Sequence, residues 1–348
     1  MSGLLQIDGA SGGGQILRSS LSLAAASGRG FEVRRIRAHR PKPGLRPQHL
    51  VCVQASAEVC SATTSGAGVG SEELRFEPGS IRGGRFEYEI PTAGSVSLVA
   101  QTLIPPLLLA RTQSEVAVSG GTHVEWAPPF EYLERIYGAA LRAMGAEVSF
   151  KLLRHGFFPR GGGRIAFTIR PARLTGHDTE QLCVRDLRRP QDSRIRLSVE
   201  AVTAGLPEHV GRRMIESARK RLSGLRADCS VKRLPGGPGA YLFVHLSDAL
   251  NEWVGAGFVA YGRRGLPAER LGESAAAEAI GFVDSGADVD VHLADQLLVP
   301  AACLGRSMRF RCPRISDHLR SNASVVEAFG LARIRIEPPG DVTIECAS

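Results

Sequence analysis

The sequence lacks the features of secreted, membrane-spanning and zinc-module proteins. No apolar run approaches the ~20 residues that cross a bilayer, and the longest, residues 103–110, is interrupted by Pro105 and Pro106. The chain does not open on a basic segment followed by an apolar one, as a signal peptide does. Its seven cysteines are scattered and never spaced C-x-x-C, which argues against a disulfide framework. We expect a cytoplasmic protein with no membrane partner.

Several enzyme signatures are also missing. The chain has no Gly-Lys-Ser/Thr phosphate loop, no spaced dinucleotide-binding glycines, no H-E-x-x-H, no Ser-His-Asp spacing and no calcium-loop string. Its formal net charge of +8 favours an anionic partner, although a bulk charge is weak evidence.

The positive charge is concentrated between residues 34 and 46, where no acidic residue occurs. A solvated basic face is the simplest interpretation, but Pro41, Pro43, Gly44 and Pro47 predict a loop, on which guanidinium groups can converge on one anion. We therefore favour an anion site. Its cations are Arg34, Arg35, Arg37, Arg40, Lys42 and Arg46.

A related helix-start string occurs three times. It reads GGGQILR at residues 12–18, AGS followed by QTLIP at 93–105, and HLADQLLVP at 292–300. The last two share Gln-x-Leu-(Ile/Val)-Pro. Such recurrence indicates duplicated supersecondary units.

The hydrophobic patterns predict an α/β fold of three repeated β-α-β-α-β-β units. We expect a main domain of residues 1–183 and 287–348, interrupted by a small inserted α/β domain at 184–286. Among the predicted elements are helices at 15–26 and 293–304, and a helix at 322–329 preceded by a loop. Two hairpins are also predicted, one of strands 73–76 and 85–90 and one of strands 333–337 and 341–345.

The first helix start has two interpretations. A glycine-rich turn exposes unpaired N–H groups and the positive end of the helix dipole, which suits a phosphate, and Gln15 and Arg18 share one face. Alternatively, residues 12–14 only allow strand and helix to pack closely, with Arg18 on the surface. The motif alone leaves both open.

Three histidines lie at positions that favour chemistry. His49 follows the basic loop at a predicted helix start, and His292 lies in the third repeated string. His318 is expected on a loop just before a helix, where an imidazole is more readily deprotonated and hence nucleophilic. Five others show no partner pattern and are interpreted as structural or surface residues: His123, His155, His177, His209 and His245.

Over essentially its whole length the chain resembles the RNA 3'-terminal phosphate cyclase family. The motifs that carry the resemblance are GGGQILR (12–18), RAHRPKPGLRPQHL (37–50), TAGSVSLVAQTLIP (92–105), RHGFFPRGGG (154–163), HLADQLLVP (292–300) and HLRSN (318–322). The family fold has three repeats like the C-terminal domain of translation initiation factor three, plus an inserted domain.

The resemblance implies an ATP-dependent reaction on RNA 3' ends. A histidine attacks the α-phosphorus of ATP, AMP passes from the histidine to the RNA 3'-phosphate, and the neighbouring 2'-OH closes a 2',3'-cyclic phosphate as AMP leaves. The implied nucleophile is His318, with Arg18, Arg40 and His49 as further catalytic groups. The implied ATP contacts are Gln101, Pro128 or Pro129, His292, Leu293, Ala294, Asp295 and Gln296, and the implied RNA-phosphate contacts are Gln15, Arg37, Arg40, Gln48 and His49.

One departure from the family concerns the divalent metal, Mg or Mn. Family members usually carry a glutamate before the glycines that helps to hold the metal, and here Ser11 stands roughly in its place. A serine cannot replace a carboxylate as a hard-cation ligand, so Asp8 and Asp295 are the candidate substitutes. Leu-Arg-Ser-Asn in place of the usual Leu-Leu-Thr-Asn after His318 is a milder change.

Three functional hypotheses follow. We expect an active RNA-terminal cyclase, because the nucleophile and the ATP segment are retained. The lost glutamate favours the alternative, a non-catalytic RNA-binding or ribosome-assembly protein on the same fold. A third hypothesis is adenylation of phosphorylated DNA ends, since contacts to a 2'-OH are not legible from residue types. The oligomeric state is not indicated.

Overall fold

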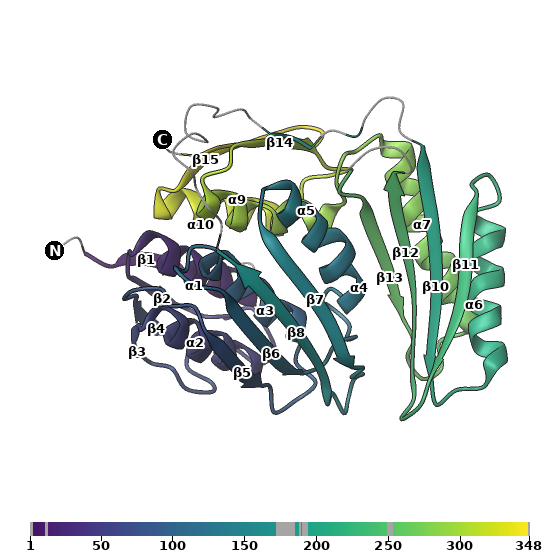
Figure 1. The fold of residues 1–348 in the computed structure, drawn as a ribbon, viewed down its shortest axis with the longest axis horizontal. Coiled ribbons are helices and arrows are strands. Elements are labelled where there is room, and N and C mark those ends of the chain that lie inside the picture. The colour runs from purple at the N-terminus through teal and green to yellow at the C-terminus, as the bar shows by residue number, and fades with distance from the viewer. Residues whose placement is uncertain are drawn as a thin grey trace.

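The computed structural model describes residues 3–10, 13–171, 185–187, 189, 194–248 and 253–346. In these residues the chain forms four four-stranded sheets with helices packed on them (Figure 1). The predicted mixed α/β class is thus confirmed. No helix in this part of the chain is long and apolar enough to cross a membrane, and each of its six cysteines is a free thiol.

The first sheet has the strand order β1-β2-β4-β3. Its strands are β1 (Leu5–Asp8), β2 (Phe31–Arg34), β3 (Thr63–Ser65) and β4 (Leu74–Glu77), covered by α1 (Gly14–Ser27) and α2 (Pro47–Cys60). In β2 and β4, alternate residues such as Phe31 and Phe76 are buried, as expected for strands with one face on the core.

The predicted hairpin of strands 73–76 and 85–90 is wrong. β4 pairs with β2 and with the three-residue β3, whereas β5 (Arg85–Glu89) pairs with β6 (Ser114–Gly120) in the second sheet. β3 reads Thr-Thr-Ser and carries no apolar alternation, so its pairing leaves no hydrophobic signal in the sequence.

The second sheet has the order β5-β6-β8-β7, with β7 (Glu147–Arg154) and β8 (Gly163–Arg170) forming its antiparallel edge. α3 (Val96–Leu107) lies between β5 and β6 in sequence, and is almost entirely buried. The later helical segment consists of α4 (Phe130–Tyr132), the π-helical turn η1 (Leu133–Tyr137) and α5 (Gly138–Ala143).

The C-terminal sheet has the order β15-β16-β14-β9. Its strands are β9 (Arg185–Asp186), β14 (Met308–Arg311), β15 (Ala332–Glu337) and β16 (Asp341–Cys346). The predicted helix 293–304 is instead two helices, α8 (Val291–Gln296) and α9 (Leu298–Leu304). Pro300 explains the division, because it has no N–H to donate to the carbonyl of Gln296 one turn earlier.

The last helix, α10 (Asp317–Phe329), begins five residues before the predicted start at 322. The hydroxyl of Ser316 caps it by accepting a hydrogen bond from the Leu319 N–H at 3.1 Å, as N-cap serines do. His318 therefore lies in the first turn of a helix and not on a loop.

The fourth sheet, with the order β11-β10-β12-β13, stands beside the second (Figure 1). It contains β10 (Ile195–Ala204), β11 (Ala227–Leu234), β12 (Gly239–Asp248) and β13 (Ala256–Tyr261), with α6 (Glu208–Arg221) and α7 (Ala268–Ser285). Residues 185–186 pair with the C-terminal sheet, so this fourth sheet begins at Ile195.

Helix α1 is central to the packing that positions the candidate site. It contacts α2, α3, α9 and α10, and the Ser22 hydroxyl donates to the Thr102 carbonyl of α3 at 2.7 Å. Because these helices are packed side by side, residues at the start of α1 lie close to residues of α2, α8 and α10.

Candidate active site

Gln15, in the first turn of α1, contacts two residues that lie 280 and 303 positions further along the chain. Its side-chain amide donates to Asp295 Oδ2 of α8 at 2.9 Å, and its carbonyl oxygen contacts Nδ1 of His318 on α10. A carbonyl oxygen only accepts, so Nδ1 of His318 carries the proton. Nε2 then keeps its lone pair, as a nucleophilic nitrogen must.

Electrostatics also favour a neutral His318. Partial burial, followed by the positive charges of Arg18 and Arg40, lowers its pKa. The Asn322 amide holds the site together by donating to the Asp295 carbonyl at 2.7 Å, while the Asn322 oxygen accepts from Ser19 of α1. The His318 imidazole is thus uncharged, exposed and fixed in one tautomer.

Two glycines at the start of α1 bring three basic side chains against the backbone. A Cβ at Gly14 would lie 2.2 Å from His49 Nε2 and 3.0 Å from an Arg18 nitrogen, and a Cβ at Gly13 would lie 3.4 Å from Arg40. Gly13 at the N-cap has no side chain that could cap the first N–H groups of α1, and no other described residue is seen to cap them. Unpaired N–H groups next to arginines suit an anion such as phosphate.

His49 is neutral in this setting. Burial, followed by the charges of Arg18, Arg37 and Arg46, lowers its pKa to about 3. Its Nδ1 accepts a hydrogen bond from the Arg46 N–H at 3.1 Å, so the proton lies on Nε2, the nitrogen that faces Gly14. His49 can therefore donate a hydrogen bond to an anion at the start of α1.

Two of the predicted phosphate contacts brace the framework. Arg37, with a positive φ of 56°, donates to the carbonyls of Lys42 at 2.7 Å and Gly44 at 3.1 Å, which shapes the basic loop. The side-chain oxygen of Gln48 accepts a hydrogen bond from the Ser95 N–H at 2.7 Å and so links α2 to the start of α3. The role of either residue in binding RNA stays a prediction.

The predicted ATP contacts lie along α3, α8 and the turn before α4. Gln101 donates to Gln296 at 2.6 Å across α3 and α8. His292 is exposed at the start of α8, whereas Leu293 and Ala294 are buried, so only their backbone is available to a ligand.

The turn that contains Pro128 is tied to α8 by the residue that caps that helix. Asp290 accepts hydrogen bonds from the N–H groups of His292 and Leu293 at 2.9 Å and from the Tyr132 hydroxyl of α4 at 2.8 Å. Pro128 comes just before α4, so this contact holds the two predicted adenine-contacting segments together.

The two carboxylates proposed for the metal are both engaged. Asp8 accepts from the Ala10 N–H at 3.0 Å and pairs with Arg35. Burial raises the pKa of Asp295 to about 7, although Gln15 opposes the shift, so much of this group is protonated near neutral pH. Neither is a ready hard-cation ligand, and Ser11 lies outside the described residues. Among the described residues near the start of α1, these two carboxylates therefore do not fit a hard divalent metal.

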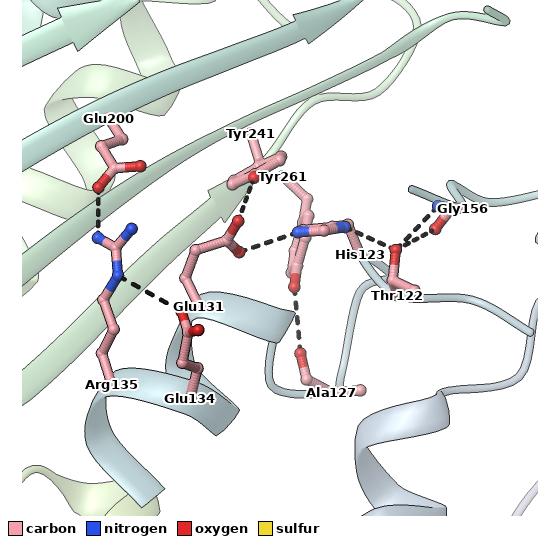
Figure 2. A network of polar contacts seen from close by, with 10 residues as sticks. All are labelled: Thr122, His123, Ala127, Glu131, Glu134, Arg135, Gly156, Glu200, Tyr241 and Tyr261. Carbon is pink, nitrogen blue, oxygen red and sulfur yellow. Dashed lines mark hydrogen bonds and ion pairs between the residues drawn. The ribbon is translucent and has the colours of Figure 1, made fainter. Parts of the chain in front are cut away.

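A second polar network lies between the second and fourth sheets (Figure 2). The carboxylate of Glu131 accepts from His123 Nε2 at 2.9 Å and from the Tyr241 hydroxyl of β12 at 2.7 Å. The other nitrogen of His123 lies 2.8 Å from the Thr122 hydroxyl, and the ring of His155 stacks on that of His123 with centroids 5.1 Å apart.

His123 and His155, interpreted from the sequence as structural or surface residues, are thus both part of this network. Burial opposes ionisation of Glu131, yet hydrogen bonds from His123 and Tyr241 lower its pKa to about 2. Glu131 lies 8 residues from His123 and 110 from Tyr241, so the contact with Tyr241 leaves no local pattern in the sequence.

The fold and the candidate site are those of a mixed α/β protein in which histidines and arginines surround a helix start. Such an arrangement is typical of proteins that bind an anion. A family model described as RNA 3'-terminal phosphate cyclase matches residues 10–336, and the chain belongs to this family.

Proteins named RNA 3'-terminal phosphate cyclase resemble the chain over most of their length. That of Pseudomonas fluorescens is 41% identical over 345 residues, which cover 98% of this chain and 97% of the relative. That of Pseudomonas aeruginosa is 44% identical, with 95% and 94% covered. That of the archaeon Archaeoglobus fulgidus is 39% identical, with 94% and 95% covered.

Proposed function

We propose that this protein uses ATP to convert an RNA 3'-terminal phosphate into a 2',3'-cyclic phosphate, with His318 as the covalent nucleophile. The observation that supports this most directly is the contact between the Gln15 carbonyl and His318 Nδ1, which leaves Nε2 unprotonated. The names of the relatives supply the substrate class.

The proposed reaction has three displacements. His318 Nε2 attacks the α-phosphorus of ATP, the bond to the β-phosphate oxygen breaks, and pyrophosphate leaves. An oxygen of the RNA 3'-phosphate then attacks the same phosphorus, the P–N bond breaks, and His318 is restored. Finally the 2'-OH attacks the RNA phosphate, loses its proton and expels AMP. A difficult ring closure is thus divided into easier steps.

The surrounding side chains have distinct proposed roles. Arg18, Arg40 and the Nε2–H of His49 stabilise negative charge on phosphoryl oxygens near the start of α1, a contribution commonly worth several kcal/mol. Gln15 sets the tautomer of His318, which extends the phosphate-binding role expected from the sequence. His292 and Pro128 are proposed to flank adenine. Mg²⁺ or Mn²⁺ would arrive on the phosphates of ATP, as magnesium commonly does.

The topology supports a finer proposal about the fold. The first, second and C-terminal sheets have the orders β1-β2-β4-β3, β5-β6-β8-β7 and β9-β14-β16-β15. In each sheet the strands numbered along the chain as first, second, fourth and third are neighbours in that order. We propose that these sheets are three repeats, and that the fourth sheet belongs to an inserted domain within residues 184–286.

The test is self-adenylation with α-labelled ATP and either metal. We expect acid-labile label on the protein, its loss in His318→Ala, and its retention in His209→Ala, an exposed histidine on α6. Unlabelled protein under both metals would contradict the proposal and favour a non-catalytic RNA-binding role.

Oligonucleotides that end in a 3'-phosphate separate RNA from DNA as the substrate. RNA should give the cyclic phosphate, whereas DNA has no 2'-OH and should stop at the adenylated end. If neither oligonucleotide is cyclised while His318 is still labelled, only the first step of the proposed reaction would stand.

A further inference from the structure

We propose that His123, Glu131 and His155 form a binding site for a divalent transition metal, zinc by preference, between the second and fourth sheets. One possible ligand atom from each residue lies within 4.8 Å of the other two. The described part of the chain thus places three metal-binding side chains next to one another. The site is separate from the start of α1 and does not depend on the proposed cyclase reaction.

The donor set selects the kind of metal. Two imidazoles and one carboxylate are the ligands of many zinc sites, whereas magnesium and calcium prefer oxygen ligands alone. Two nitrogens that both bind zinc at ~2.0–2.1 Å are at most ~4.2 Å apart. Because the ligand atoms already lie within 4.8 Å of one another, metal binding requires the rings to approach by at most on the order of an ångström.

His155 supplies the second observation. Its Nε2 is buried and has no hydrogen-bond partner among the described residues, an exception among buried polar atoms that calls for an explanation. Burial, followed by the nearby His123, lowers the pKa of His155 to about 4. The ring is therefore neutral near pH 7, the form that binds a metal, and a metal ion would give Nε2 its missing partner.

The neighbours of His123 and Glu131 are placed to orient these two side chains as metal ligands. When Nε2 of a histidine binds a metal, Nδ1 carries the proton and needs an acceptor. The Thr122 hydroxyl lies 2.8 Å from Nδ1 and 3.4 Å from the Gly156 carbonyl, to which it can then donate (Figure 2). Tyr241 holds the second carboxylate oxygen of Glu131 at 2.7 Å, which orients the first oxygen.

A fourth coordination position is available. A cavity of about 230 Å³ is lined by Glu131, His155 and Tyr241, together with Glu134, Glu200 and Lys232. It is large enough for a water molecule to complete a tetrahedral set. The three ligands come from segments next to the second sheet, and Tyr241 of β12 in the fourth sheet reaches the site only through its hydrogen bond to Glu131.

The experiment is zinc titration of the full-length protein, freed of any affinity tag and stripped with a chelator, against a competing chromophoric indicator. We expect one tight site that raises the unfolding temperature. His155→Ala should abolish it without loss of fold, because the Nε2 of His155 has no partner to lose. Thr122→Val keeps all three ligands and should weaken binding about 10–100-fold, while His209→Ala should bind as the wild type does.

Cobalt distinguishes this site from the free cysteines of the chain. Nitrogen and oxygen ligands should give a visible d–d band without the intense near-ultraviolet thiolate band that a cysteine ligand produces. The proposal is wrong if wild-type and His155→Ala proteins bind zinc with equal stoichiometry and affinity, or if the cobalt spectrum shows thiolate ligation. In either case the network functions as the hydrogen-bonded bridge seen in Figure 2.

Discussion

Two histidines of this protein are each connected to a buried carboxylate, in arrangements with opposite consequences. His318 reaches Asp295 through Gln15, whereas His123 contacts Glu131 directly and Tyr241 adds a second donor. Both carboxylates are buried, yet the pKa of Asp295 is raised to about 7 and that of Glu131 is lowered to about 2.

The number and nature of the donors explain this difference. Burial raises the pKa of a carboxyl group, and hydrogen bonds to its charged form lower it. Asp295 has one neutral amide donor, while Glu131 has an imidazole and a phenol. The first arrangement leaves one nitrogen of an exposed histidine free to react. The second engages both nitrogens of a buried histidine, so in the absence of a metal it stabilises the structure.

Breaking the first arrangement should have the largest effect. Gln15→Leu removes the acceptor for Nδ1 of His318, so the ring can rotate and place its proton on Nε2. We expect the single-turnover rate of self-adenylation to fall by about 100-fold or more, and the free energy of unfolding to fall by only about 1 kcal/mol from the lost hydrogen bond to Asp295.

Gln54→Leu is the matched control, because Gln54 is an exposed glutamine on α2. If both glutamine variants are adenylated at the wild-type rate, Gln15 does not set the tautomer.

Breaking the second arrangement should cost stability and not chemistry. Glu131→Ala leaves His123 and Tyr241 buried without their acceptor, and we expect the free energy of unfolding to fall by about 3 kcal/mol. Glu134→Ala, on the next turn with its side chain 41% exposed, should cost about 1 kcal/mol or less. Urea unfolding in a chelating buffer measures both, and equal losses would contradict the proposed difference.

The pH dependence of the Glu131 effect follows from its pKa. Because the pKa is lowered from 4.5 to about 2, the contribution is present above pH 4.5 and is lost as the pH falls towards 2. The gap in stability between wild type and Glu131→Ala should therefore narrow over that interval.

Asp295 should show the reverse dependence on pH. Its folded-state pKa is raised from 3.8 to about 7, so its contribution is present below pH 3.8 and is lost as the pH rises through 7. Asp295→Asn resembles the protonated form and does not titrate. In metal-free buffer it should be more stable than the wild type at pH 8, by on the order of 4 kcal/mol, with a smaller gap at pH 5. A gap independent of pH would show that Asp295 is ionised throughout.

The sequence predicted much of the fold where apolar periodicity is strong. The helix expected at 15–26 is α1, and the hairpin expected at 333–337 and 341–345 is β15 with β16. It failed where pairing is polar and short, as in β3. It also misplaced the start of α10, although Ser316 followed by Asp317 is a recognisable helix start.

The candidate site was predicted as separate residues and not as a set of contacts. His318, Gln15 and Asp295 were each identified, but the bonds among them join α1, α8 and α10 across 280 to 303 positions. Such contacts depend on how the helices pack. The second network was missed for the same reason, because β12 supplies Tyr241.

The smallest effect is expected from the removal of a single hydrogen-bond donor to Glu131. Tyr241→Phe removes one of the two donors to Glu131 and nothing else from its carboxylate, so the group should move towards the behaviour of Asp295. We expect the pKa of Glu131 to rise and the free energy of unfolding to fall by about 1–2 kcal/mol, both measured in chelator by carboxyl NMR titration and urea unfolding. Tyr261→Phe, which loses only a bond to the neutral Ala127 carbonyl at 3.2 Å, should leave that pKa unchanged. If Glu131 titrates identically in both variants, His123 alone keeps it ionised. The difference in pKa between Glu131 and Asp295 would then come from the kind of donor, an imidazole or an amide, and not from the number of donors.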